Sequence, residues 1–396
     1  MDRSQRPAPH LVNGLRRLVD DIRRTANPQA VGLTDVVCGS TSLLTFPNDD
    51  VYYCGHSVEV LADLHSFEEV AWLLLHGRLP GEEELADWSS LISDSAVLDS
   101  SSTEIFSILP AGARPLDLFP LCISLLSFFD PTPHDISVDA SRSRVWRLLA
   151  QLPLMLTAGL NGREFRDFDD AAGTETRAAR ESLTWAGRLL HALRGTETLP
   201  TVTEDAAMNV VMICQCLTEM RPACFASRFA ASTSAQIQAS IQSAATVFVS
   251  QLRNDPFAWT SDLLRGFQNP SQAEAWWRRR EGQPMPFGFS STPGDCRVGL
   301  LAEVSQTLLG SIDRIRIAAA AARLEKLLEV ENMSPTPDWA AAKVMTLLNI
   351  PADRQTLVVA MARLVGWAAH AIEQQSSGNA LLPILRYGTA DESETP

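Results

Sequence analysis

The chain has 396 residues, of which 45% are apolar and 20% are charged, and its formal net charge is −14 at pH 7. This composition excludes a broadly disordered chain, and the negative charge disfavours binding to nucleic acid or to an anionic membrane surface. Because the length exceeds what one hydrophobic core usually supports, we expect one large domain and one smaller domain.

Two features stand out in the first part of the chain. Residues 1–24 are rich in arginine, but aspartates interrupt them and no apolar segment follows. This pattern predicts an amphipathic opening helix rather than an organellar transit peptide. Further on, β-branched and aromatic residues flank the polar turn Pro47–Asp50, and they predict a short hairpin or small sheet within residues 35–61.

Most of the remaining chain has helical periodicity. Apolar residues at three- and four-residue steps predict helices over residues 175–195 and 356–379, with Gly195 and Gly378 as their stops. Residues 300–330 are predicted as one longer helix whose alanine run permits close packing. The polar segment that carries the sequence WWRRRE lies between two clusters of helix breakers, which suits a smaller inserted lobe.

The seven cysteines are odd in number and show no repeated spacing, which indicates a reducing compartment, and we expect a cytoplasmic protein. Cys214, Cys216 and Cys224 match no common zinc pattern, so we expect buried core thiols and no metal. The uncharged segment 229–252 contains too many Ser, Thr and Gln residues to face lipid, so no membrane span is expected.

Five stretches of the sequence, of which Ser66–Trp88 is the longest, carry a family resemblance. The sequence SFEEVAWLLLHGRLPGEEELADW at Ser66–Trp88, together with GLTDVVCGSTSL, YCGHSVEVLA, ARPLDLF and MARLVGWAAHAIEQ, resembles the citrate synthase and 2-methylcitrate synthase family over residues 31–387. The resemblance implies a mainly α, two-domain helical fold with a small N-terminal β element. Residues 1–254 would begin the large domain, residues 255–349 would form the small domain, and residues 350–396 would return to the large domain.

The same resemblance implies a reaction of the tricarboxylic acid cycle type. Family members are homodimers that condense acetyl-CoA or propionyl-CoA with oxaloacetate by a Claisen step, so an acyl-CoA would be a co-substrate and no cofactor would be bound permanently. Such a step needs a carboxylate base at the thioester methyl group and hydrogen-bond donors for the developing enolate. The family supplies an aspartate and two histidines for these tasks, with a third histidine and arginines on the oxo-acid carboxylates.

Several residues fall on the family's site positions. Asp338 matches the catalytic aspartate, although a helix N-cap after Pro337 is an alternative role for it. Arg297 and Arg363 match arginines that grip a carboxylate, or else they form plain ion pairs. Arg386 is the one arginine near the altered C-terminal Arg-Pro motif, or else a surface residue. Together these residues predict a pocket for a small carboxylate.

The family's site histidines have no counterpart in this chain. The residues that stand in their places are Gln215 and Thr218, Arg253, and Gly288 or Ser290. The sequence contains no histidine between His191 and His370, which is the interval where all three belong, so no shift of alignment restores them. Losing one preorganised oxyanion donor costs about 3–4 kcal/mol, so losing two would slow the reaction on the order of 10⁴- to 10⁵-fold.

Three interpretations follow. The first is a catalytically degenerate family member that acts as a binding or partner subunit, either as a homodimer or paired with an active citrate synthase. The second is an active acyltransferase with a rebuilt site, in which Asp338 is the base and Arg253 stabilises the enolate. The third is a sensor for a small carboxylate without CoA, because Asp255 and Phe257 fill the room that the family's glycine-rich turn leaves for the thioester.

Overall fold

The structure is a computed structural model of the chain. It describes residues 33, 36–47, 50–95, 98, 101, 104–110, 113–161, 182–252, 254–280, 286–291 and 294–383. Residues Thr41–Pro396 form one compact unit, and the fold below is that of this unit. The predicted opening helix at residues 1–24 lies outside the described residues. The same is true of the predicted site residues Arg253 and Arg386.

A small antiparallel sheet opens the compact unit. Its strands β1 (Leu44–Thr45), β2 (Tyr52–Tyr53) and β3 (His56–Ser57) pair in that order. The β2–β3 turn has positive φ at both central residues, Cys54 and Gly55, as hairpin turns of type I′ require. The predicted small N-terminal β element is therefore confirmed.

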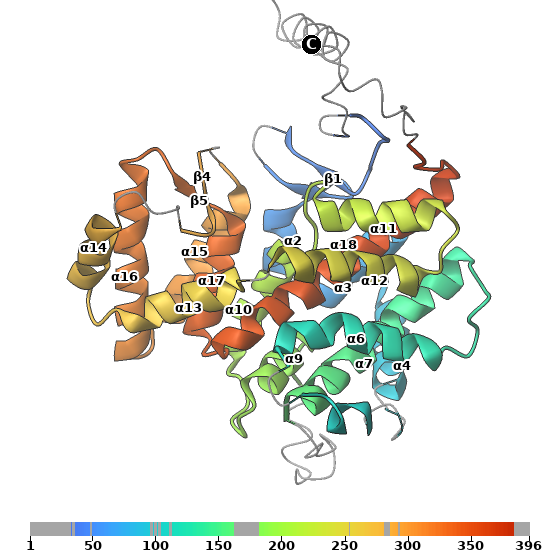
Figure 1. Cartoon of the computed structure of the whole chain (residues 1–396), viewed down its shortest axis with the longest axis horizontal. Coiled ribbons are helices and arrows are strands. Elements are labelled where there is room, and N and C mark those ends of the chain that lie inside the picture. The colour runs from blue at the N-terminus through green and yellow to red at the C-terminus, as the bar shows by residue number, and fades with distance from the viewer. Residues whose placement is uncertain are drawn as a thin grey trace, which may run out of the picture. The chain divides into compact units, whose positions relative to one another are not determined.

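Helices make up the bulk of the unit (Figure 1). The first group contains α2 (Val58–Leu64), α3 (Phe67–His76), α4 (Glu82–Ser95), the 3₁₀-helix η3 (Ile105–Ser107), α6 (Pro115–Phe128), α7 (Val138–Asn161), α9 (Trp185–Arg194), α10 (Val202–Gln215), α11 (Pro222–Ser232), α12 (Ile237–Gln251) and α18 (Ala352–Ser377). The predicted mainly α fold is confirmed by this arrangement.

Local sequence signals set the ends of several of these helices. Ser66 and Glu69 form a reciprocal capping box at the start of α3, and Thr201 and Glu204 form another at the start of α10. Helices α9 and α18 end, as predicted, at glycines in the left-handed conformation. Helix α9 begins at Trp185, where the Thr184 side chain caps it, so the predicted continuous helix from residue 175 is wrong at residues 182–184. Residues 175–181 of that prediction lie outside the described residues.

Helix α18 is the centre of the core. Every residue from 355 to 372 is buried, and α3, α6, α11 and α12 pack around it. By length and composition α18 passes a test for a membrane span among the described residues, but its whole apolar window is buried inside the fold. Its hydrophobicity is thus explained by core packing. The buried free thiols of Cys214, Cys216 and Cys224 lie in the same core, as predicted.

The second group of elements appears together at the left of Figure 1. It contains α13 (Pro256–Gly266), α14 (Pro270–Arg279), β4 (Phe289–Ser290), α15 (Cys296–Thr307), α16 (Ile312–Glu329), β5 (Ser334–Pro335) and α17 (Pro337–Leu347), with β4 and β5 paired antiparallel. These elements lie within the predicted small domain. The boundaries of that domain stay a prediction.

The single long helix predicted over residues 300–330 is wrong. The chain forms α15 and α16 instead, with a break at residues 308–311. The Ser311 side chain accepts a hydrogen bond from the Arg314 backbone N–H and caps the start of α16. Gly310 just before it also disfavours a continuous helix, because glycine loses more backbone entropy on folding than other residues. The apolar periodicity therefore continues across a real helix break.

Candidate functional site

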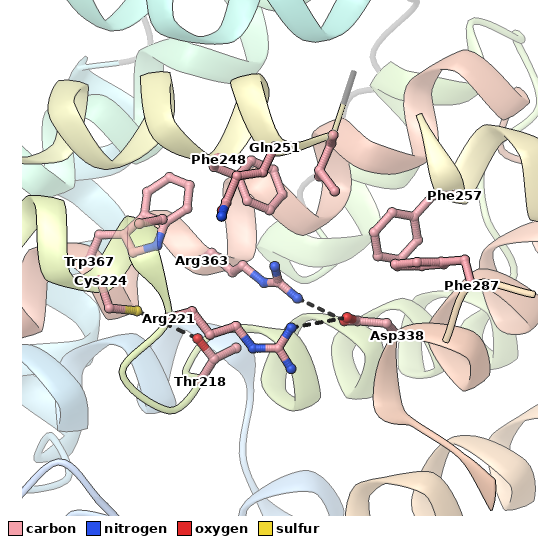
Figure 2. Close-up of a pocket in the computed structure, with 12 residues that line it drawn as sticks. Thr218, Arg221, Cys224, Phe248, Gln251, Phe257, Phe287, Asp338, Arg363 and Trp367 are labelled. Carbon is pink, nitrogen blue, oxygen red and sulfur yellow. Dashed lines mark hydrogen bonds and ion pairs between the residues drawn. The ribbon is translucent and has the colours of Figure 1, made fainter. Parts of the chain in front are cut away.

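A cavity of about 90 Å³ lies where α17 and α18 meet the starts of α11 and α13 and the end of α12 (Figure 2). Its apolar wall includes three phenylalanines and Trp367. Its charged groups are one carboxylate, that of Asp338, and two guanidinium groups, those of Arg221 and Arg363. The sequence predicted two of these three groups as site residues.

Asp338 lies between the two guanidinium groups. Its Oδ1 accepts a hydrogen bond of 2.7 Å from Arg363, and its Oδ2 lies 3.6 Å from an Arg221 nitrogen. Thr336 is the N-cap residue of α17, so Asp338 sits inside the first helical turn and the alternative of an N-cap role for it is wrong. Its carboxylate faces the cavity charges instead (Figure 2).

Arg363 is held rigidly from α18. The nitrogen that bonds Asp338 also donates to the side-chain oxygen of Gln215 at 3.1 Å, and the guanidinium lies 5.2 Å from the centre of the Phe248 ring. Gln215 in turn donates to the Pro337 carbonyl at 3.0 Å, so one amide links α10, α17 and α18. The Arg363 Nε is buried and has no hydrogen-bond partner among the described residues. Burial lowers the pKa of Arg363, while Asp338 opposes this shift.

Sequence reasoning missed Arg221. It is the N-cap residue of α11, directly before Pro222, and its side chain is 54% exposed. A cation at this end of a helix is opposed by the helix dipole, and N-caps prefer Ser, Thr, Asp or Asn. An arginine at a predicted helix start is therefore a signal that could have found it.

Arg297 does not line the cavity. Its guanidinium bonds both carboxylate oxygens of Asp295 and donates to the backbone carbonyls of Leu217, at 3.0 Å, and Cys214, at 3.4 Å. These carbonyls end α10, where a cation is favoured by the helix dipole. Burial alone would lower the pKa of Arg297, but Tyr53 and Asp295 outweigh it and raise the pKa. The geometry favours the ion-pair alternative for this residue.

Phe257 and Asp255, which the sequence predicted to fill the room for the thioester, make packing and helix-capping contacts. Phe257 is buried, lines the cavity and packs edge-on against Phe287 with ring centroids 5.0 Å apart. Asp255 caps α13 by accepting a hydrogen bond from Ala258 N–H, and it also accepts one from the Thr356 hydroxyl. Apolar rings therefore occupy this side of the cavity.

No histidine is among the described residues that line the cavity. His370, one turn beyond Trp367 on α18, accepts a hydrogen bond of 3.1 Å from the Arg228 Nε. In the part of the chain that the structure describes, no group of three or more His, Cys, Asp or Glu side chains is placed to hold a metal ion.

Comparison with known proteins agrees with the fold and the sequence resemblance. Residues 32–387 match the family model described as citrate synthase, C-terminal domain. The protein named citrate synthase 2 of Bacillus subtilis (strain 168) is 26% identical over 369 residues, which is 92% of this chain and 96% of that protein. The 2-methylcitrate synthase of Mycobacterium tuberculosis (strain H37Rv) is 26% identical over 367 residues, covering 90% and 89% of the two chains.

Solved structures of citrate synthases have the same fold. That of Pyrobaculum aerophilum superposes with a TM-score of 0.75 at 21% identity, over 92% of this chain and 94% of that one. The Thermoplasma acidophilum enzyme, in a ternary complex with carboxymethyl coenzyme A and oxaloacetate, gives a TM-score of 0.75 at 20% identity, over 91% and 97%. Because the family model spans most of its length, this chain belongs to the citrate synthase family.

Proposed function

We propose that this chain binds a small carboxylate in the cavity beside Asp338 and does not catalyse the family's condensation at an enzymatic rate. It then acts as a binding or partner subunit. The observation that carries the proposal is the absence of histidine between His191 and His370, since imidazole donors are what the family uses to stabilise the enolate. The cavity geometry is a second reason to expect no condensation, because both oxygens of Asp338 face guanidinium groups and this carboxylate is not free to act as a base.

Carboxylate binding is supported by the two arginines. A guanidinium group can grip a carboxylate with two parallel hydrogen bonds, and burial strengthens such bonds. Arg363 is buried, lines the cavity and has an unpartnered Nε, so it retains donor capacity beyond its bond to Asp338. Arg221 at the open side supplies a second positive charge.

We propose that Phe289 stands in the place of the third histidine, and the conformation of Gly288 supports this match. Its φ is +83°, and a Cβ built on it would lie only 2.7–2.9 Å from atoms of Trp339. This position accepts only glycine, so we match Phe287, Gly288 and Phe289 to the family's Phe-Gly-His rather than placing the histidine at Gly288 or Ser290. The Phe289 ring packs on Trp339 at 4.5 Å and offers no hydrogen-bond donor.

A second candidate function is an active acyltransferase with a rebuilt site. Arg221 favours it, because its exposed guanidinium lies beside Asp338 and is a legitimate donor to a developing enolate oxygen. In that case Asp338 is the base, and Asp338→Asn abolishes thiol release from acyl-CoA. In our proposal the wild-type protein releases no thiol in the first place.

We further propose that the protein works in the cytoplasm, as a homodimer or paired with an active citrate synthase. The odd number of cysteines supports the location in the cytoplasm, and the homodimers formed by family members support the assembly. Pull-down of the tagged protein from its own cells, followed by identification of citrate synthase subunits, separates the two assemblies. A strict self-dimer would exclude the mixed one.

Calorimetric titration with oxaloacetate and with malonate tests the carboxylate site. We expect Arg363→Gln to weaken binding about 10- to 100-fold, since a charge-assisted hydrogen bond contributes about 1.5–3 kcal/mol. The matched control is Arg279→Gln, which removes the same charge from the exposed face of α14, where this arginine hydrogen-bonds only a backbone carbonyl in its own helix. Equal affinity in both variants would refute the site.

A further inference from the structure

The two cavity arginines, Arg363 and Arg221, already contact a carboxylate of the chain itself. Asp338 receives its 2.7 Å hydrogen bond from the same guanidinium that would grip a ligand, and Arg221 lies on its other oxygen. The free volume of about 90 Å³ is well below the ~300–1,000 Å³ of typical ligand pockets. In the described state, therefore, Asp338 takes the place of a ligand carboxylate.

We propose that Asp338 is an internal competitor for the cavity arginines, which an incoming small carboxylate must displace before it binds. This inference rests on the proposed carboxylate-binding function and adds a mode of regulation to it. The displacement links two events, because Asp338 turns away from the arginines only when an external carboxylate takes them over. Asp338 is then a free carboxylate only in the ligand-bound state.

The contacts favour movement of the Asp338 side chain rather than of Arg363. Arg363 is fixed by the Gln215 amide and by the Phe248 ring, and the same amide holds the Pro337 carbonyl at the start of α17. Both the arginine and the backbone that carries Asp338 are therefore anchored. What remains free to rotate is the Asp338 side chain, which can leave Arg363 by changing its own torsions without a shift of either helix.

The ion pair between Asp338 and Arg221 is weaker than the hydrogen bond between Asp338 and Arg363. Arg221 is 54% exposed and lies at 3.6 Å, which is an ion pair without a hydrogen bond. Although Asp338 is buried, the other member of this pair is half exposed and the separation is long, so the pair contributes less than the hydrogen bond to Arg363 and is weakened by salt. An incoming carboxylate can therefore engage Arg221 first and then exchange with Asp338 at Arg363.

The displaced carboxylate has a favourable place to go. Asp338 is in the first turn of the eleven-residue helix α17, whose N-cap Thr336 makes no side-chain capping bond. Backbone N–H groups at that helix start lack helical partners and carry the positive end of the helix dipole. The released carboxylate stays close to these groups, so its displacement does not leave a buried charge without compensation.

The charges of the cavity predict how an Asp338 variant should bind. Two arginines and one aspartate give the described state a formal charge of 2 − 1 = +1. Replacing Asp338 with asparagine raises it to +2 and removes the competitor while keeping nearly the same volume. An Asp338→Asn variant should thus bind a dicarboxylate more tightly than the wild-type chain, opposite to the loss expected for an ordinary binding residue.

Calorimetric titration of the full chain with malonate, an unreactive dicarboxylate, tests the inference. We expect Asp338→Asn to bind about 10- to 100-fold more tightly than wild type, and the double variant with Arg363→Gln to lose this gain. Malonate binding to wild type with equal or weaker binding to a folded Asp338→Asn overturns the competition but leaves the carboxylate site intact. Failure of wild type and of Asp338→Asn to bind malonate or oxaloacetate overturns both proposals.

A crystal structure of the wild-type protein with malonate provides the second readout, should Asp338→Asn fail to fold. We expect a malonate oxygen in hydrogen-bond contact with Arg363 and the Asp338 carboxylate turned away from it. Malonate bound in the cavity with the Asp338–Arg363 hydrogen bond intact overturns the inference.

Discussion

Gly366→Ala is expected to destabilise the protein, because α18 leaves no room for a side chain at this position. A Cβ on Gly366 would lie 2.2 Å from the Cys216 carbonyl oxygen and 3.2 Å from a Leu217 methyl carbon. Real Cβ contacts essentially never fall below 3.0 Å, so α18 and the turn after α10 must separate by about 1 Å. The same turn leads to Thr218 in the cavity wall.

Two terms decide the magnitude. Overpacking a core costs about 1–3 kcal/mol, and the upper end applies here because the atom that is met is backbone and cannot change rotamer. Alanine recovers about 0.8–1.0 kcal/mol through its better helix propensity. We expect a net loss of about 2 kcal/mol, which urea unfolding measures directly and which lowers the thermal midpoint by about 2–4 °C.

Gly299→Ala is the matched control. Gly299 is an exposed residue of α15, and no atom lies within 4 Å of a Cβ placed there. The helix-propensity term then acts alone and should stabilise the protein by up to about 1 kcal/mol. If Gly366→Ala stabilised the protein as Gly299→Ala does, the close approach of α18 to the turn after α10 would be refuted.

Two further predictions concern buried charges. Arg297→Met leaves the partly buried Asp295 carboxylate and the carbonyls of Cys214 and Leu217 without their buried donor, so we expect a loss of about 1–3 kcal/mol in urea unfolding; normal stability combined with lost malonate binding would show instead that Arg297 serves the ligand. Burial, reinforced by the nearby Arg228, lowers the pKa of His370 to about 4, so the folded state keeps this ring neutral. Stability should therefore fall as the pH drops from about 6.5 through about 4, and His370→Gln should lessen this fall between pH 7 and pH 4.5; an unchanged pH profile of the urea midpoint would contradict the shift.

The parts of the fold that sequence reasoning found are those with local signals. The end of α18 at Gly378 and the small sheet follow from residues adjacent in the chain. The break before α16 also had local signals, Gly310 and Ser311, but the continuing apolar periodicity concealed them. At this position the periodicity and the capping signal disagree, and the capping residue correctly marks the start of α16.

The site was predicted less completely because its pairing is tertiary. Asp338 and Arg363 were identified through the family resemblance, yet nothing local indicates that they bond each other or that Arg221 reaches the same carboxylate. Arg297 has the same residue type and the same family match as Arg363, but it is bound to Asp295 and to the end of α10. Which arginine faces a cavity depends on the packing of helices distant in sequence.

One assay tests most directly whether the absence of imidazole from the cavity region has removed the condensation activity. The purified protein is mixed with oxaloacetate and either acetyl-CoA or propionyl-CoA, and release of the CoA thiol is followed, with an authentic citrate synthase as positive control. We predict no release above the uncatalysed rate. Turnover at about 1–1,000 per second, the ordinary range for enzymes, would contradict the proposed loss of condensation chemistry.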